Sequence, residues 1–302
     1  MGIPFAIVPP VIIDDVKLLT TDVPEDAAYS EWSAAVNYVK GDRVKLSSAH
    51  KNYEAASANL NKPPLTNKLI WLEVGATNRW KVFDDKTLSQ TEQIGSMSYT
   101  LLPGKVVNTV GLINCHAKSA RVRVTDPIDG LVYDKEKKFL GSLSKGDWYE
   151  YFFEEIVRST EMVFDDLPAY GSAQVKVDIE NALNMVRCGV ITIGFKRTFG
   201  LGVSQGIGVG IQDYSRRELN DFGDPEFVKR GYSKTASFTV PLHHYEVDVV
   251  QRLLASVRAT PTLFIGSKLY NATIIYGWYR DFDINIQYRF SSEVNIDVES
   301  LV

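Results

Sequence analysis

The feature that most constrains the fold is a regular alternation of apolar and polar residues near the end of the chain. Apolar side chains occupy every second position in three consecutive segments: Ala272, Ile274, Tyr276 and Trp278; Phe282, Ile284, Ile286, Tyr288 and Phe290; Val294, Ile296 and Val298. Successive side chains of a β-strand point to opposite faces, so a period of two predicts strands with one buried face. The three segments therefore predict an antiparallel meander.

Shorter runs with the same period occur upstream. They are Ala120/Val122/Val124, Val175/Val177/Ile179, Ile191/Ile193/Phe195 and Ala236/Phe238/Val240. The segment from Asp126-Pro127 through Gly130 has residues typical of a turn between two strands. Strands and turns at this spacing predict a β-sandwich, jelly-roll-like, in the middle of the chain. We therefore expect a mainly β fold.

Helical periodicity is clear in one place. Val250, Leu253, Leu254 and Val257 share one face at helical spacing, and Pro261 prevents continuation. We expect one amphipathic helix over residues 246–258. Residues 148–160 could form a second helix, but the sequence YEYFFEEIV fits a strand equally well.

The N-terminal sequence MGIPFAIVPPVIIDD is apolar and rich in proline. It predicts an extended arm over residues 1–30 that packs on its own chain or on a neighbouring subunit. No export signal is expected, because the segment has no basic start and its prolines break an apolar helix. We expect three further regions: an aromatic-rich β module over 31–85, the β-sandwich over 86–204, and an antiparallel β region with the helix over 205–302.

Composition argues against several functions. The 302-residue chain has a formal net charge of −4 and no block of five or more basic residues, so binding to nucleic-acid phosphates is not expected. No apolar run is long enough to span a membrane, so membrane insertion is not expected. The two cysteines, Cys115 and Cys188, are interpreted as small buried apolar residues, with a disulfide as the alternative.

No group of residues gives positive support for catalysis or for a cofactor. Gly200, Gly202 and Gly206 imitate a phosphate loop, but the following IGVGIQDY would not form the helix that such a loop needs. His243-His244 precedes the predicted helix and is interpreted as a turn rather than a metal site. Adjacent acidic pairs occur at Asp14-Asp15, Asp84-Asp85, Glu154-Glu155 and Asp165-Asp166. Sequence neighbours rarely provide the separation that glycosidases need, so we expect no enzyme.

The stretch WSAAVNYVKGDRVKLSSAHKNYEAASANLNKPPLTNKLIWLEV has an ordered set of aromatic residues, Trp32, Tyr38, Tyr53 and Trp71, around Gly41-Asp42. It resembles the small chitin- and cellulose-binding modules of carbohydrate-binding families 5 and 12. The resemblance implies a glycan site, for which Trp32, Tyr38, Tyr53 and Trp80 are the candidates. In chitin-binding members an exposed Trp pair follows the Tyr-x-Ala, where this chain has Ser57 and Ala58.

The segment GATNRWKVFDD directly after this module resembles one found in tail and adaptor structural proteins of tailed bacteriophages. The resemblance implies a virion structural protein of the tail or neck, made in the host cytoplasm and assembled with copies of itself and neighbouring tail proteins. A glycan-binding adhesin that recognises host surface polysaccharide is the alternative. Within Trp71–Asp85, we expect Trp71 to complete the module, Thr77-Asn78-Arg79 to form a connector, and Trp80 to begin the next region.

Overall fold

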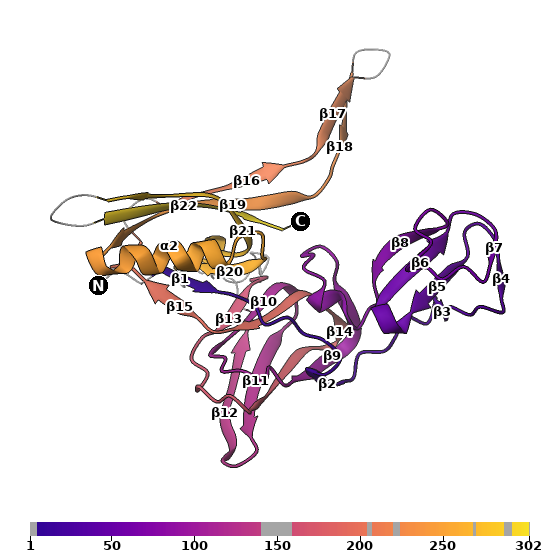
Figure 1. Cartoon of the computed structure of the whole chain (residues 1–302), viewed down its shortest axis with the longest axis horizontal. Helices are drawn as coiled ribbons and strands as arrows, with labels where there is room; N and C mark the ends of the chain where they lie inside the picture. The colour runs from indigo at the N-terminus through magenta and orange to yellow at the C-terminus, as the bar shows by residue number, and fades with distance from the viewer. Residues whose placement is uncertain are drawn as a thin grey trace, which may run out of the picture.

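The computed structural model describes residues 5–139, 159–203, 207–219, 224–267, 270–286 and 292–301. The fold is mainly β, as the alternation predicts, with a small lateral module, a middle sheet, a C-terminal sheet and a projecting hairpin (Figure 1). The uncertain helix or strand at 148–160 lies almost wholly outside the described residues, as do Glu154-Glu155, Tyr288 and Phe290.

The lateral module is a four-stranded sheet with a small two-stranded addition. Its strands are β3 (Ser30–Glu31), β5 (Arg43–Leu46), β6 (Lys51–Ala55) and β8 (Trp71–Ala76), with β4 (Asn37–Tyr38) paired to β7 (Asn59–Leu60). The 3-10 turn η1 (Ser47–Ala49) joins β5 to β6, and His50 ends it in the left-handed conformation, with a φ of 56°.

The middle region is one sheet built around a single long strand, β14 (Gln174–Gly194). Its other strands are β2 (Leu18–Thr21), β9 (Thr91–Leu101), β10 (Thr109–His116), β11 (Ser119–Asp126), β12 (Gly130–Lys138) and β13 (Met162–Phe164). The first part of β14 pairs with β11 and the last part with β10, while β9 pairs along the opposite edge across an irregularity between Glu180 and Met185. The two layers of this sandwich-like region are therefore connected through β14.

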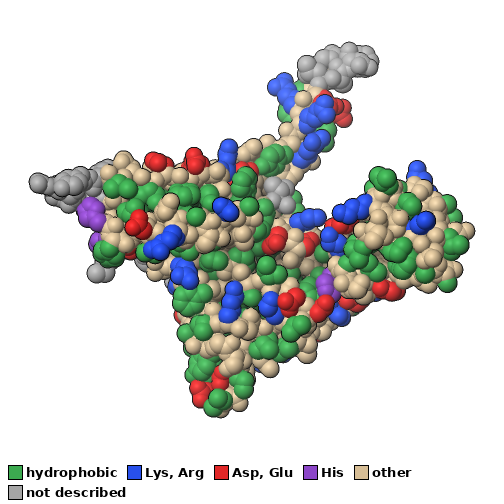
Figure 2. Space-filling model, in the orientation of Figure 1, with side chains coloured by type: hydrophobic (Ala, Val, Ile, Leu, Met, Phe, Trp, Pro, Cys, Tyr) green, Lys and Arg blue, Asp and Glu red, His purple; other side chains and the backbone are tan. Residues whose placement is uncertain are grey.

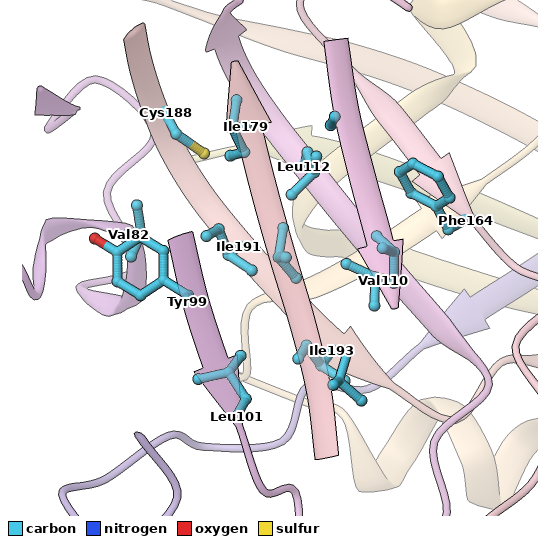
Figure 3. Close-up of a cluster of buried hydrophobic side chains, with 14 of the residues drawn as sticks. Val82, Tyr99, Leu101, Val110, Leu112, Phe164, Ile179, Cys188, Ile191 and Ile193 are labelled. Carbon is cyan, nitrogen blue, oxygen red and sulfur yellow. The ribbon is translucent and has the colours of Figure 1, made fainter. Parts of the chain in front are cut away.

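Side chains from β9, β10, β11 and both parts of β14 meet in one core (Figure 3). Tyr99, Val110, Ile179 and Ile193 are buried there. Val82, from the 3-10 turn η2 (Lys81–Phe83), lies beside Tyr99 (Figure 3), so the connector after the module contributes to the core of the middle region. The predicted strands and the predicted turn at Asp126–Gly130 are present.

The C-terminal sheet has seven strands in the order β15-β1-β20-β21-β22-β19-β16. Their bounds are β1 (Phe5–Val8), β15 (Arg197–Phe199), β16 (Gly208–Asp213), β19 (Tyr232–Leu242), β20 (Thr262–Ile265), β21 (Ile274–Asn285) and β22 (Ser292–Ser300). The expected amphipathic helix is α2 (Val247–Ser256), which follows the turn η3 (His244–Glu246). Its buried Val250 and Leu254 pack against one face of this sheet.

The apolar N-terminal segment packs on its own chain. β1 lies between β15 and β20, and Phe5 is fully buried among Phe199, Phe238 and Phe264. The opposite side of the same strands, with Ala6 and Leu263, packs against Ile113 of the middle sheet. The N-terminal segment was expected to pack either on its own chain or on a neighbouring subunit, and these contacts match packing on its own chain.

The predicted meander is wrong in one respect. The first two alternating segments are not separate strands: after the turn η4 (Asn271–Thr273) they form the single strand β21, which pairs with β22. The register shifts between Tyr279 and Asp281, so residues before and after this bulge that share a parity face opposite sides. Ile274 and Ile275 are both buried because this half of β21 has packing on both faces.

Candidate functional site

The aromatic residues of the module form its core. Tyr38, Tyr53 and Trp71 are buried, and the rings of Tyr38 and Trp71 meet edge to face with centroids 5.1 Å apart. Trp71 Nε1 donates to the carbonyl oxygen of Lys62 at 2.8 Å, and the backbone N–H of Ser33 donates to Tyr38 Oη at 2.8 Å. The rings of Tyr38 and Trp71 thus fill space between strands while their polar atoms have partners.

These positions do not form a sugar-binding platform. Stacking on a sugar requires an exposed ring face, but Tyr38, Tyr53 and Trp80 are at most 8% exposed, and Trp32 packs partly buried against the module core. Tyr38 and Tyr53 therefore pack inside the module and Trp80 at its junction, while Trp32 keeps part of its surface open to solvent. The glycan-binding assignment, which came from the family resemblance, stays a prediction.

Trp80 lies at the junction between the module and the middle sheet. Its ring stacks on His50 of the module, with centroids 3.8 Å apart, and meets Phe83 edge to face at 5.9 Å. Phe83 in turn meets Tyr99 of β9 at 5.6 Å. His50 Nε2 also lies 3.1 Å from Asp15 Oδ2, which ties the module to the segment after β1. The module is thus attached through a continuous series of ring contacts.

The Thr77-Asn78-Arg79 connector is held by hydrogen bonds to the segment that precedes the module and to β9 of the middle sheet. The Asn78 side chain exchanges two hydrogen bonds of 3.0 Å with the backbone of Glu92. The backbone N–H of Asn78 donates to Asp26 Oδ2, and Tyr99 Oη donates to the carbonyl oxygen of Arg79. These contacts agree with the interpretation of Trp71–Asp85 as the link between module and body.

The other sequence candidates have structural surroundings. The glycine-rich stretch continues into the strand β16 and not into a helix, with residues 204–206 outside the described residues. The backbone N–H of His243 donates to Glu246 Oε2 at the start of η3, as expected for a turn before the helix. Wherever the structure describes the chain, it holds no group of three His, Cys, Asp or Glu residues arranged for a metal ion. Among the same residues, no helix is both long and apolar enough to cross a lipid bilayer.

The two cysteines are neighbours across the strands of the middle sheet. Cys115 on β10 pairs with Cys188 on β14, both are free thiols and fully buried, and their Sγ atoms are 3.1 Å apart. Burial, together with the neighbouring Cys188, raises the pKa of the Cys115 thiol. Both side chains thus behave as small apolar residues in the reduced protein.

A cleft of about 300 Å³ lies where the middle and C-terminal sheets meet. Its charged residues include Glu161, which forms an ion pair with Lys234 of β19 and accepts from Thr160 Oγ1 at 2.9 Å. The Glu161 carboxylate therefore already has partners, and its ion pair with Lys234 connects the two sheets.

The most exposed part of the described chain is a hairpin that leaves the C-terminal sheet (Figure 1). We call residues Tyr214–Gly231 the arm; it contains β17 (Arg216–Leu219) and β18 (Pro225–Val228), which pair only with each other. Phe227 is 70% exposed, and Val228 is exposed as well. An isolated two-stranded ribbon is at best marginally stable in water, so the arm requires either an anchor or a partner.

The arm has an anchor at its base. Tyr214 Oη and Ser233 Oγ both donate to Glu299 Oε1 of β22, at 2.6 and 2.8 Å, and Glu299 is only 8% exposed. This network fixes where the arm leaves the sheet, but it makes no contact with Phe227 or Val228 further along. The outer part of the arm is therefore available to another molecule.

Sequence reasoning did not predict the arm. A usable signal was present, because RREL and PEFVKRG lack the alternation of the surrounding strands and combine apolar with charged residues. No protein-family model matches the chain, and neither the comparison with curated proteins nor that with solved structures found a match.

Proposed function

We propose that this protein is a structural component of a bacteriophage virion, in the tail or neck, and that it acts by assembling with copies of itself and with neighbouring tail proteins. The observation that carries the proposal is the arm: a two-stranded ribbon with exposed Phe227 and Val228 and no core of its own. Ribbons of this kind gain their stability by lying on another surface.

The sequence supports the same proposal. The segment GATNRWKVFDD, which resembles tail and adaptor proteins, lies at the junction where Trp80 and Val82 attach the module to the body. The alternative, a glycan-binding adhesin, receives no support from the module's aromatic residues, because the buried rings of Tyr38, Tyr53 and Trp71 offer no face to a sugar.

Fractionation of the particles tests the proposal. An antibody against the chain should detect it in phage particles purified by density gradient, and the purified protein should form oligomers whose population rises with concentration in sedimentation velocity. Deleting residues 215–230 and joining the ends with a short glycine linker should abolish the oligomers while the rest of the fold remains. A protein absent from particles and monomeric at every concentration would contradict the proposal.

A further inference from the structure

The arm carries a cluster of positive charge. Arg216 and Arg217 on β17 and Lys229 and Arg230 just after β18 are all exposed, and we call these four residues the basic band. Figure 2 shows Lys and Arg side chains along the projecting arm, with acidic side chains among them. The pairing Arg217↔Phe227 places these two side chains on one face of the ribbon, and Lys229, two residues from Phe227, shares that face.

On the side of the C-terminal sheet opposite α2, the part that does not pack on the middle sheet faces solvent and carries a cluster of negative charge. Asp281 and Asp283 on β21 and Glu293 and Asp297 on β22 lie on this side, and we call them the acidic face. Acidic side chains are visible along the upper surface of the sheet in Figure 2. Asp281 and Asp297 are direct cross-strand partners, an arrangement that is destabilising unless a positive charge compensates it.

Apart from the exposed Trp278 of β21, this face is mostly polar. Its uncharged positions include Ser237, Thr239 and Asn295, which are linked to the strands beside them by hydrogen bonds: Ser237 Oγ donates to Asp297 Oδ1 at 2.5 Å and Thr239 Oγ1 to Asn295 Oδ1 at 2.8 Å. Arg280 reaches Glu299 at 3.6 Å, which places its charge at the base of the arm rather than over Asp283. Among the described residues, no ion pair compensates Asp281, Asp283 or Asp297.

We propose that the arm of one copy lies across the acidic face of a second copy, with the ribbon face that carries Arg217, Phe227 and Lys229 opposite Asp281, Asp283 and Asp297. The arm points away from its own sheet (Figure 1), so one chain does not bring its own two surfaces together. Each copy then uses its arm for one neighbour and its acidic face for another. Such a heterologous contact generates a ring or a helical filament. The inference rests on the proposed assembly function and names the two surfaces that perform it.

The dimensions and charges suit this partner. At about 3.3 Å per residue, the six residues Tyr214–Leu219 extend about 20 Å and the nine of β22 about 30 Å, so the arm can lie along the sheet within one neighbour. Glu218 and Glu226 face each other on the ribbon face opposite Arg217 and Lys229, and Glu218 forms an ion pair with Arg216. The face with Arg217 and Lys229 is therefore the one that suits a protein surface with acids in one defined patch.

Charge reversal in two separate variants tests the inference. The arm variant carries Arg217→Glu and Lys229→Glu, and the face variant carries Asp281→Lys and Asp283→Lys; all four side chains are exposed, so both variants should keep the circular dichroism spectrum and unfolding midpoint of the wild type. In sedimentation velocity at low ionic strength, each variant alone should associate at least tenfold more weakly than the wild type. An equimolar mixture should regain association, because reversed arms then meet reversed faces and unaltered arms meet unaltered faces.

A matched control is Lys40→Glu with Lys68→Glu on the module, which changes the net charge of the chain as the arm variant does and should leave association unchanged. Oligomers that form normally in both charge-reversal variants would overturn this inference while leaving the assembly function in place. A mixture that fails to regain association would also overturn it. A wild-type chain that stays monomeric at every concentration and is absent from particles would overturn the assembly function itself.

Discussion

Replacing Trp80 with alanine distinguishes a packing role from a sugar-binding role. The ring is 8% exposed, so most of the 150–250 Å² that a large aromatic residue buries is lost from the junction. At about 25 cal/mol per Å² this corresponds to roughly 4–6 kcal/mol, close to the ~3–5 kcal/mol typical of a buried Trp→Ala change. We expect a loss of ~3–5 kcal/mol, because His50 and Phe83 lose the ring between them.

The assay is guanidinium unfolding followed by tryptophan fluorescence, together with limited proteolysis of the native protein. Trp80→Ala should lower the unfolding midpoint and should speed cleavage near Thr77–Arg79, because the module is then held mainly by the connector. Leu72→Ala, at a side chain 56% exposed on the same module, serves as control and should change stability by no more than about 0.5 kcal/mol. If Trp80→Ala kept full stability and instead lost retention on insoluble chitin, the ring would be a binding residue and this reasoning would fail.

Three further predictions concern the body of the protein. Phe5→Ala should destabilise the chain by ~3–5 kcal/mol in the same unfolding assay, because its fully buried ring lies between Phe199 and Phe238; an unchanged midpoint would show that β1 is dispensable. Burial raises the pKa of Asp84, so its contribution to stability is present at low pH and is lost as the pH rises through the folded-state pKa. Asp84→Asn should therefore raise the unfolding midpoint at pH 7 more than near pH 4, and an equal effect at both pH values would contradict this. Cys115 and Cys188 should be unreactive toward a thiol reagent in the native protein and both reactive after unfolding, and rapid labelling of native protein would show that they are accessible.

The local periodicity of the sequence predicted those elements whose burial follows a simple pattern. The strand with Val122 and Val124 and the helix with Val250 and Leu254 each have one apolar face and one polar face, so period and burial agree. β21 departs from this because the bulge after Tyr279 changes which parity is buried, and because its first half is covered on both sides. A bulge and a second packing face depend on partners far away in the sequence, which a local pattern does not specify.

The same limitation applies to the candidate site, because its residues are neighbours in space and not in the sequence. The sequence does not distinguish the packing role of Trp80 from that of Trp71. Only the contacts of Trp80 with His50 and Phe83 in space show that its ring fills the junction. The N-terminal segment was predicted to pack on a surface, but its place between β15 and β20 depends on strands that begin about 190 and 255 residues later. Such long-range pairings follow from the whole fold, since each strand completes its backbone hydrogen bonds with whichever edge the fold leaves open.

The C-terminal sheet and the arm each carry a feature that is unfavourable in isolation. One face of the sheet is covered by α2, the other packs in part against the middle sheet, and its remaining part places Asp281 and Asp297 opposite each other on neighbouring strands. The arm extends from this sheet with Phe227 in water and with Arg217 and Lys229 on the same side of the ribbon. Each feature is unfavourable in isolation, and the two have opposite charge. One contact between copies compensates both, because it brings cations to the acidic face and gives the ribbon a surface to lie on, which makes association with a second copy the simplest physical account of both features.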